Sequence, residues 1–192
     1  MNQAENKRNT IIYGGAFNPP TRAHQAIVQA CIEHAQTIDA DVWLLPSGDR
    51  SDKTISVSRQ RRLQLLQALV NDVILHDVQL DIDTAELDRN EQTETYDTVM
   101  GMNESYPDRR FIWVFGSDSI VTMPSWRGGE WLMENLPMLV IERAGSPVEK
   151  LGRYALLLPV HTTMVSSTEV RRRLAANEAI EDLVTPSVLS CL

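Results

Sequence analysis

Short apolar runs alternate along this chain with longer stretches in which apolar residues recur every three or four positions. The runs at residues 11–13, 41–46 and 111–115 are apolar at nearly every position, which is typical of strands buried on both faces. Apolar residues at helical spacing predict helices over residues 21–35 and 63–70. The first half of the chain therefore alternates between buried strands and amphipathic helices.

The same alternation continues in the second half. We predict further strands at residues 73–75, 138–141 and 154–158, helices over 96–102 and 166–176, helical structure after Ile180, and an irregular segment over 79–94. Strands that are apolar on both faces and alternate with helices predict an α/β fold with a doubly wound parallel sheet. Such sheets bind ligands outside the carboxyl ends of their strands, so the candidate site lies in the loops after residues 13, 45, 115 and 158.

Length and charge narrow the class of protein. The 192 residues carry 18 Lys and Arg against 26 Asp and Glu, a net charge of −8. We expect one domain over residues 1–192, with residues 1–9 flexible, 177–192 a helical tail, and no nucleic acid as partner. No apolar run reaches the ~18 residues of a membrane helix, and the polar start lacks the apolar stretch of a signal peptide. Cys31 and Cys191 lack zinc or disulfide spacing, so we expect a cytoplasmic protein with no metal site of its own.

The loop after residue 13 has the composition of an anion site. It reads Gly14-Gly15-Ala16-Phe17-Asn18-Pro19-Pro20-Thr21-Arg22-Ala23-His24. Glycine allows the backbone to approach a ligand closely, and a helix N-terminus offers free N–H groups to an anion. Thr21 fits the N-cap position, and His24 in the first turn can donate to a phosphate oxygen. The same residues also fit an ordinary corner between a strand and a helix, so the loop alone does not identify the ligand.

A second candidate is the start of the late helix, Ser166-Ser167-Thr168-Glu169-Val170-Arg171. Ser166 and Glu169 have the spacing of a capping box, which would make this an ordinary helix start. Hydroxyl and N–H groups at a helix start can also cradle a phosphate, and Arg171 can reach the same anion. Successive residues are turned by about 100°, so at most one or two of Arg171, Arg172 and Arg173 can serve the site, and we expect the others to be solvated.

Two further loops carry candidate binding residues. Gly116 ends the clearest strand, and Asp118 can accept from ribose hydroxyls, meet a metal, or simply cap a helix. Trp126, within residues 124–129, offers either a flat surface for an aromatic ring or a cover for the edge of the core. The chain has no GxxxxGK[ST], GxSxG or HExxH motif, which argues against a P-loop ATPase and gives no sign of a serine hydrolase or zinc protease.

The loop at residues 14–24 and the late stretch 166–171 together resemble the (H/T)xGH and SSTxxR signatures of the nucleotidyltransferase superfamily. Within the superfamily the chain is similar to the nicotinate (or nicotinamide) mononucleotide adenylyltransferases. Residues 95–98, the stretch from Gly116 to Trp126 and the tail 180–188 carry this narrower resemblance. It runs from residue 11 to residue 192, is poorest over 47–58, and implies a Rossmann-like nucleotidyltransferase fold.

The chain departs from the family pattern at a few positions. Asn18 stands where many bacterial members have Asp, Thr21 replaces the first His of the motif, and Ala23 replaces its Gly. Residues 50–53 read Arg-Ser-Asp-Lys where the bacterial enzymes usually have Pro-Pro-His-Lys. Lys53 can keep the phosphate role, but the changed surroundings leave the identity of the mononucleotide open.

The resemblance implies an enzyme of NAD biosynthesis that moves AMP from ATP to nicotinate or nicotinamide mononucleotide and releases pyrophosphate. The protein would align two polyanions and neutralise charge on the α-phosphate, with His24 and Arg171 as the charge-stabilising pair. The residues implied for ATP are Gly15, Ala16, Phe17, Thr21, His24, Gly116, Asp118, Ser166, Ser167 and Arg171, and those for the mononucleotide are Lys53, Thr95, Trp126 and Arg127. Mg²⁺ is expected to accompany ATP, bound mainly by phosphate oxygens and water.

Two alternatives stay open at this point. The acceptor can be another phosphate monoester such as phosphopantetheine, or the chain can be a catalytically silent nucleotide-binding module. The sequence also leaves open the choice between nicotinate and nicotinamide and whether the chain forms a homo-oligomer.

Overall fold

A parallel sheet forms the centre of the molecule. The computed structural model describes residues 7–48, 57–89, 94–142, 151–160 and 165–192. These residues form a six-stranded sheet of β1 (Arg8–Gly15), β2 (Ala40–Pro46), β3 (Leu80–Ile82), β4 (Arg109–Gly116), β5 (Met138–Ile141) and β6 (Ala155–Leu158). The strands lie in the order β3-β2-β1-β4-β5-β6, and every neighbouring pair is parallel. The predicted doubly wound parallel sheet is confirmed.

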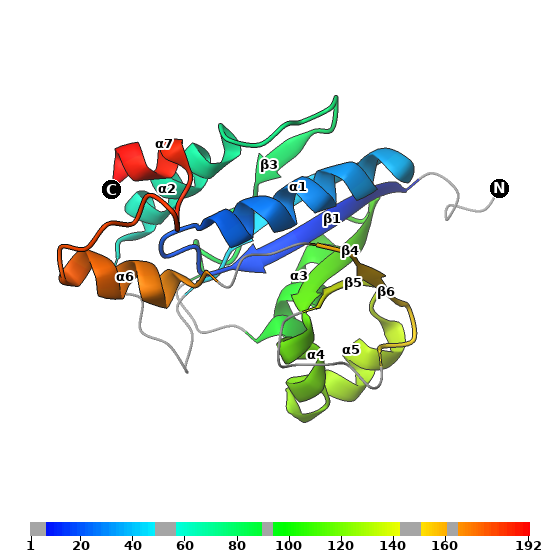
Figure 1. Ribbon diagram of the computed structural model, residues 1–192. Coiled ribbons are helices and arrows are strands. Elements are labelled where there is room, and N and C mark those ends of the chain that lie inside the picture. Colours follow the sequence, from blue (N-terminus) through cyan, green and yellow to red (C-terminus); the bar gives the residue numbers. More distant parts are fainter. Residues whose placement is uncertain (1–6, 49–56, 90–93, 143–150, 161–164) are drawn as a thin grey trace.

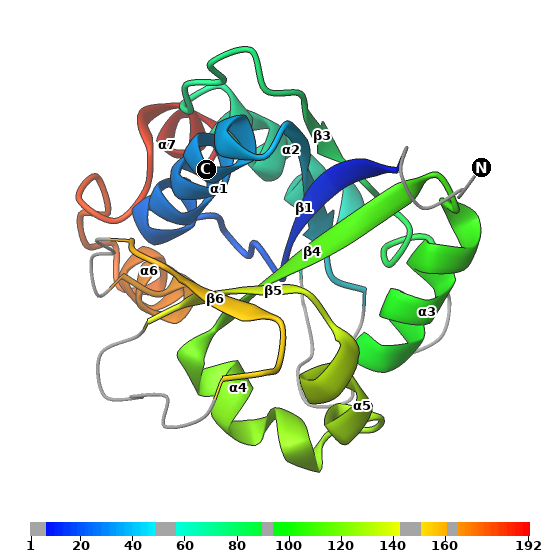
Figure 2. The ribbon, with the colours of Figure 1, turned by 90° about the vertical axis from the view of Figure 1, so that its right-hand side faces the viewer.

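Helices cover both faces of this sheet. They are α1 (Arg22–Thr37), α2 (Arg59–Val70), α3 (Thr95–Ser105), α4 (Ser117–Thr122), the 3₁₀ helix η2 (Met123–Ser125), α5 (Gly129–Asn135), α6 (Ser167–Ala175) and α7 (Pro186–Cys191). Helices α1, α2, α6 and α7 pack on one side and α3, α4 and α5 on the other (Figures 1 and 2). None of these helices is long and apolar enough to cross a membrane, as far as the described ranges reach.

The middle positions of the central strands are apolar because both faces of the sheet are buried there. Ile11 and Tyr13 belong to the core beneath α1, whereas Ile12 belongs to the core beneath α3. Consecutive residues of a strand point to opposite faces, so a strand with two covered faces favours apolar side chains at every position, and a polar side chain such as that of Asp41 needs buried partners. This explains the apolar runs from which the sheet was predicted.

The predicted strand at residues 73–75 is wrong. This segment lies in the turn after α2, where Ile74 is 64% and Leu75 41% exposed. The backbone N–H of Ile74 donates to Oε1 of Gln29 at 2.9 Å, and its carbonyl accepts from Nε2 of Gln29 at 3.2 Å. The side chain of Gln29 in α1 thus binds the backbone N–H and C=O groups of Ile74 with which a neighbouring strand would pair. The third strand is instead β3, which lies in the segment expected to be irregular and pairs with β2.

The two ends of the chain also differ from expectation. β1 begins at Arg8, so the last part of the segment expected to be flexible belongs to the sheet. Only α7 is helical in the tail after Ile180, because the turn before it is bound to α1. The backbone N–H of Arg22 donates to the carbonyl of Leu183 at 2.9 Å, and Ile180 and Val184 are buried there.

The sequence pattern does not predict α4 and α5, which are six and seven residues long. A helix of this length contains less than two turns and shows no clear period. Their buried residues Ile120 and Leu132 fill the core beneath α3. Gly129 at the start of α5 lies so close to the chain before it that a Cβ would come within 1.8 Å of the carbonyl oxygen of Met123.

A buried carboxylate binds two arginines at the amino edge of the sheet. Asp41 of β2 has no exposed surface, and its Oδ1 accepts from Nη2 of Arg8 at 2.5 Å. Its Oδ2 accepts from Nη1 of Arg109 at 2.7 Å. Arg109 also donates to Oγ1 of Thr10 and lies 4.4 Å from the ring centroid of Trp43. These contacts tie β2 to β1 and β4 at the end of the sheet opposite the candidate site.

Candidate active site

The order in which the strands are added to the sheet reverses at its centre, between β1 and β4. β1 and β4 are neighbours, and the helix after β1 packs on one face whereas the helix after β4 packs on the other (Figure 2). The two loops that leave these strands therefore diverge at the carboxyl edge of the sheet. Open α/β sheets bind their ligands at this position. The predicted loops at residues 14–24 and 116–118 both begin there.

Thr21 and His24 form the corner between β1 and α1. Thr21 is the N-cap of α1, and its backbone N–H donates to Nδ1 of His24 at 3.1 Å. The Thr21 hydroxyl lies 2.7 Å from the same nitrogen and accepts from the His24 backbone N–H at 3.5 Å. A ring nitrogen that accepts from a backbone N–H carries no proton, so the neutral imidazole of His24 has its proton on Nε2. Nε2–H is then the group with which His24 can donate to a phosphate oxygen.

Phe17 turns its ring into the protein. Its φ is +46°, and its ring is buried 5.6 Å from the ring of Tyr13 and 5.3 Å from the imidazole of His24. The ring also lies against Gly15, where a Cβ would come within 3.3 Å of it. What residues 15–17 can offer to a ligand is therefore mainly their backbone, as the sequence analysis expects.

The late helix docks onto this early loop. The hydroxyl of Ser167 donates to the carbonyl of Pro19 at 2.8 Å, and Nη1 of Arg171 donates to the carbonyl of Asn18 at 2.6 Å. Residues that are 148 and 153 positions apart in the sequence are thus in direct contact. Nη2 of Arg171 donates to Oγ1 of Thr168 at 3.1 Å, and no carboxylate among the described residues forms an ion pair with this guanidinium. Arg171 is therefore fixed in place while it keeps its positive charge.

Ser166 caps α6. Its hydroxyl accepts from the backbone N–H of Glu169 at 3.2 Å, which is one half of the predicted capping box. The other half does not form, because the carboxylate of Glu169 binds Arg172 and Arg173 instead. Ser166 is exposed and Ser167 is half-buried against the early loop, so two hydroxyls stand at the start of this helix.

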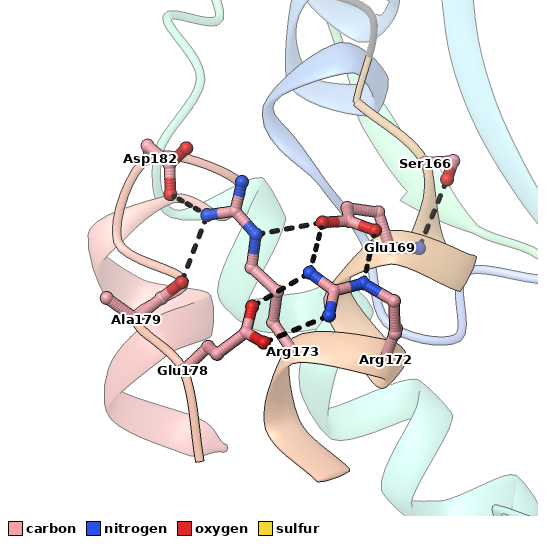
Figure 3. Close-up of polar contacts among 7 residues, drawn as sticks. All are labelled: Ser166, Glu169, Arg172, Arg173, Glu178, Ala179 and Asp182. Carbon is pink, nitrogen blue, oxygen red and sulfur yellow. Dashed lines mark hydrogen bonds and ion pairs between the residues drawn. The ribbon is translucent and has the colours of Figure 1, made fainter. Parts of the chain in front are cut away.

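A network of ion pairs covers the outer face of α6 (Figure 3). Arg172 lies 2.9 Å from Glu169 and 2.8 Å from Glu178, and Arg173 lies 2.9 Å from both Glu169 and Asp182. Hydrogen bonds from Arg172 and then from Arg173 lower the pKa of Glu169 from 4.5 to about 2. Arg172 is exposed to solvent as expected and Arg173 is half-buried, but the sequence did not predict that both form ion pairs. Their charges are neutralised, and they tie α6 to the chain that follows it.

Asp118 lies in the first turn of α4, directly after β4. The N-cap of α4 is Gly116, so the interpretation of Asp118 as a helix cap is wrong. The residue is exposed at the carboxyl edge of the sheet, whereas its neighbour Ser117 is buried. A carboxylate in this position can accept hydrogen bonds from the hydroxyls of a bound ribose.

Two other predicted residues, Thr95 and Arg127, lie on segments that contact each other where α3 faces the turn before α5. Thr95 begins α3, and Nη1 of Arg127 donates to Oδ2 of Asp97 in the first turn of that helix at 2.5 Å. The ring of Tyr96 lies over Gly128, where a Cβ would come within 2.3 Å of Cδ2 of the ring. Gly128 has a φ of +66°, a conformation that favours glycine. The segments around Thr95 and Arg127 are therefore packed together.

Trp126 stands next to the carboxyl end of β4. It is half-buried, and its ring is edge-on to Phe115 with the centroids 6.3 Å apart. It packs against the core beneath α3 and keeps part of its surface exposed, so it can cover the core edge and also stack on a ligand. Lys53, the remaining residue predicted to bind the mononucleotide, lies outside the described residues.

Arg62, which was not predicted from the sequence as a site residue, reaches the same edge of the sheet from α2. Arg62 is 1% exposed, and its Nη1 donates to the carbonyl oxygens of Ser47 at 2.7 Å and Ala16 at 3.2 Å. A signal was present in the sequence. Arg62 precedes Leu65 and Leu66 by three and four positions, so it shares the buried face of its helix. An arginine on the apolar face of a helix predicts a buried guanidinium that needs hydrogen-bond partners inside the protein.

Known proteins resemble this chain over most of its length. The model of the cytidylyltransferase-like family matches residues 12–173. The chain is 30% identical over 179 residues to the "Probable nicotinate-nucleotide adenylyltransferase" of Exiguobacterium sibiricum, with 92% of each chain covered. It is 28% identical over 188 residues to the protein of the same name from Bordetella avium, with 92% of this chain and 91% of that protein covered.

Solved structures agree with this result. The chain is similar to Plasmodium falciparum nicotinic acid mononucleotide adenylyltransferase complexed with NaAD, with a TM-score of 0.80 and 26% identity. The structure of the same Plasmodium enzyme complexed with APC gives a TM-score of 0.76 and 26% identity. Both comparisons cover 96% of this chain and 94% of the other.

Proposed function

This chain belongs to the cytidylyltransferase-like family and is a relative of the nicotinate-nucleotide adenylyltransferases, and we propose that it transfers AMP from ATP to nicotinate mononucleotide. A phosphate oxygen of the mononucleotide attacks the α-phosphorus of ATP and forms the new P–O bond. The bond from that phosphorus to the bridging oxygen breaks, and pyrophosphate leaves with the electron pair. The other product is the dinucleotide, which makes the reaction a step of NAD biosynthesis.

The observation that carries this proposal is the contact between the early loop and the late helix. Ser167 and Arg171 donate to the carbonyls of Pro19 and Asn18, and Thr21 and His24 follow at the start of α1. A triphosphate bound at the start of α1 would then meet groups from both segments. This supports one shared site better than two unrelated helix starts.

His24 and Arg171 are proposed as the charge-stabilising pair. Nε2–H of His24 donates to the α-phosphate, and the guanidinium of Arg171 offsets the charge that builds there during attack. No nucleophilic side chain is required, because the attacking group is already a phosphate anion. The other residues proposed for ATP are Gly15, Ala16, Phe17, Thr21, Gly116, Asp118, Ser166 and Ser167.

The mononucleotide is proposed to lie next to the carboxyl end of β4. The exposed part of Trp126 stacks on the pyridine ring, and Thr95 and Arg127 lie near the rest of the molecule. Lys53 is proposed as a further contact of the mononucleotide from its place in the sequence alone. Nicotinate is favoured over nicotinamide by the names of the relatives and by the Plasmodium complex with NaAD.

Mg²⁺ is proposed to enter with ATP. Mg²⁺ keeps several waters and is commonly bound through substrate phosphates and one or two carboxylates. Among the described residues, no group of three or more His, Cys, Asp or Glu side chains could hold a metal ion. We therefore propose that the phosphates of ATP carry the ion and that the protein holds those phosphates. The ion would offset negative charge on the leaving pyrophosphate.

The cytoplasm is the proposed compartment, because ATP and pyridine mononucleotides are available there and buried Cys31 can stay reduced. A chain with a net charge of −8 that binds two polyanions must concentrate its cations. Arg171, without a carboxylate partner among the described residues, fits this requirement.

The test is pyrophosphate release by the purified chain with ATP and Mg²⁺. Nicotinate mononucleotide, nicotinamide mononucleotide and phosphopantetheine are supplied in parallel as acceptors. We expect nicotinate mononucleotide to give a kcat/KM at least about tenfold above the amide, since the two differ by a full charge and in their hydrogen-bond pattern. Turnover with phosphopantetheine alone would replace the proposal with the related transferase. ATP binding without pyrophosphate release from any acceptor would identify a silent nucleotide-binding module.

A further inference from the structure

A buried arginine crosses beneath the carboxyl ends of two neighbouring strands. Nη1 of Arg62 contacts the carbonyl oxygens of Ala16 and Ser47, the residues directly after β1 and β2. The two strands are paired up to Gly15 and Pro46, and the backbone N–H of Ser47 still donates to the carbonyl of Gly15 at 2.9 Å. One guanidinium therefore holds both loops where they leave the sheet.

Fixing a carbonyl oxygen also fixes the N–H group of the next residue. The C=O and N–H of a trans peptide point in opposite directions. The carbonyls of Ala16 and Ser47 face Arg62, so the N–H groups of Phe17 and Gly48 face away from it. Neither N–H has a hydrogen-bond partner among the residues that the structure describes. Backbone N–H groups that are held in a loop in this way can bind anionic or polar ligand atoms.

Two further features distinguish the turn after β2. A Cβ on Gly48 would come within 2.5 Å of the carbonyl oxygen of Glu86, so a side chain there would disturb the turn. The hydroxyl of Ser47 is buried and has no hydrogen-bond partner within the described ranges. A buried hydroxyl without a partner costs free energy unless a ligand supplies one.

The turn after β2 also lies on the side of the mononucleotide. The carboxylate of Glu86, whose carbonyl packs against Gly48, accepts from Oγ1 of Thr98 at 2.7 Å. Thr98 stands one turn into α3, the helix that Thr95 begins. The N–H of Gly48 therefore belongs with the residues proposed for the mononucleotide, and the N–H of Phe17 with those proposed for ATP.

We propose that Arg62 is a positioning residue for both substrates. It directs the N–H of Phe17 to the phosphates of ATP and the N–H of Gly48 to the mononucleotide, without touching either substrate itself. This inference rests on the proposed function, because it assigns the two N–H groups to its two substrates. A planar guanidinium suits the task, since it can donate to several carbonyl oxygens in a fixed geometry, whereas a lysine offers a compact charge on a flexible stem.

The experiment compares Arg62→Lys and Arg62→Met with Arg109→Lys, a matched change at the opposite edge of the sheet. Thermal unfolding first establishes that each variant is folded at the assay temperature. We expect both Arg62 variants to raise KM for ATP and for the mononucleotide by about tenfold or more and to lower kcat, with Arg62→Lys the milder. Arg109→Lys is expected to lose stability while kcat and both KM values stay within about twofold.

Folded Arg62 variants that keep kcat and both KM values within twofold would show that Arg62 only fills the core. A loss no larger than that of Arg109→Lys would show the same. If neither Arg62 variant folds, a crystal structure of the wild-type chain with a non-hydrolysable ATP analogue and the mononucleotide decides. The backbone nitrogens of Phe17 and Gly48 should lie within about 3.2 Å of ligand oxygens or nitrogens, and N–H groups directed elsewhere overturn the proposal.

The two proposals can fail separately. A wild-type chain that releases no pyrophosphate from any acceptor disproves the proposed function only. The dissociation constant of a non-hydrolysable ATP analogue, measured by calorimetry on the wild type and on Arg62→Lys, then tests the role of Arg62 at Phe17. We expect about tenfold weaker binding in the variant, and equal affinity would contradict the proposal.

Discussion

At the amino edge of the sheet, Arg8 and Arg109 bind the carboxylate of Asp41, whereas at the carboxyl edge Arg62 and Arg171 bind main-chain carbonyl oxygens. A carboxylate neutralises the cation that it holds. A carbonyl oxygen holds a guanidinium by its dipole and adds no opposite charge. The amino edge therefore uses arginine to join three strands, and the carboxyl edge can fix Arg171 in position while its charge remains available to an anion.

Helix α6 lies at the carboxyl edge, yet arginines on its outer face bind carboxylates, as the arginines at the amino edge do. Arg172 and Arg173 are neutralised by Glu169, Glu178 and Asp182, although they directly follow Arg171 in the sequence. Within the basic run of α6, the contrast teaches that the partner of each arginine, and not its position in the run, decides whether its charge stays available to an anionic substrate.

The largest effect is expected for His24→Ala at the carboxyl edge. Loss of Nε2–H removes a contact to the α-phosphate and should lower kcat by about 10²-fold or more, while the chain stays folded. Steady-state pyrophosphate release measures the effect, and His34→Ala on the same helix is the control. An unchanged kcat in folded His24→Ala would remove His24 from the mechanism.

A smaller loss is expected for Arg171→Ala, which removes a cation that no carboxylate among the described residues pairs with. We expect kcat/KM for ATP to fall between about tenfold and 10²-fold. Arg172→Ala, one position further on, removes a neutralised cation and should leave kcat/KM within about twofold. Equal losses in the two variants would contradict the distinction between carbonyl-bound and carboxylate-bound arginines.

Arg109→Met tests the amino edge and should act on stability alone. The variant loses a charge-assisted hydrogen bond to the buried carboxylate of Asp41, which we expect to lower the free energy of unfolding by about 2 kcal/mol. The kinetic constants should stay within about twofold at temperatures where the variant is folded. Denaturant unfolding measures the loss, with exposed Arg110→Met as the control. An equal loss in both variants would mean that Asp41 gains nothing from Arg109.

Trp126→Ala tests whether the exposed part of this ring binds substrate. Loss of a stacking surface should raise KM for the mononucleotide by about tenfold and leave KM for ATP within about twofold. Trp131→Ala, which removes a ring that packs against Tyr96, is the control. If Trp126→Ala raises both KM values equally, the residue only covers the edge of the core.

The smallest effect concerns Glu169 and its pH dependence. Arg172 and Arg173 lower the pKa of Glu169 to about 2 in the folded chain, against 4.5 without these partners. A lowered folded-state pKa contributes stability that is fully present above pH 4.5 and is lost as the pH falls toward 2. Glu169→Gln should therefore lower Tm by a few degrees at most near neutral pH, and the difference from the wild type should shrink below pH 4.5. A difference that does not change with pH would mean that the network adds no electrostatic stability.

Most of the fold could be predicted because its elements are long and buried on a clear pattern. The central strands are covered on both faces, and α1 has a broad apolar face, so sequence periodicity reports each of them. The misses have local causes. Ile74 and Leu75 are exposed and form no strand, since a glutamine of α1 binds the backbone of Ile74, and α4 and α5 are too short to show a period.

The residues of the candidate site also fall into those that could be predicted from the sequence and those that could not. The N-caps Thr21 and Ser166 could be predicted, because a cap depends on residues within three positions. The role of Asp118 as a cap was wrong, since Gly116 already occupies that position. Arg62 was missed because its partners are carbonyls that follow two other strands, and no local pattern records them.

The sequence by itself determined which segments become strands and helices, where the main helices begin, and which residue types stand at the carboxyl ends of the strands. These properties depend on neighbours within one or two turns, and their physical causes can be read along the chain. Only the tertiary structure decided that α6 docks on the loop after β1, that carboxylates pair with Arg172 and Arg173 while none of the described carboxylates pairs with Arg171, and that Arg62 holds two loops from below. Each of these features depends on which partner a group contacts after folding. A carboxylate offsets the charge of the guanidinium that it binds, whereas a carbonyl oxygen holds a guanidinium and leaves its charge available to an anion.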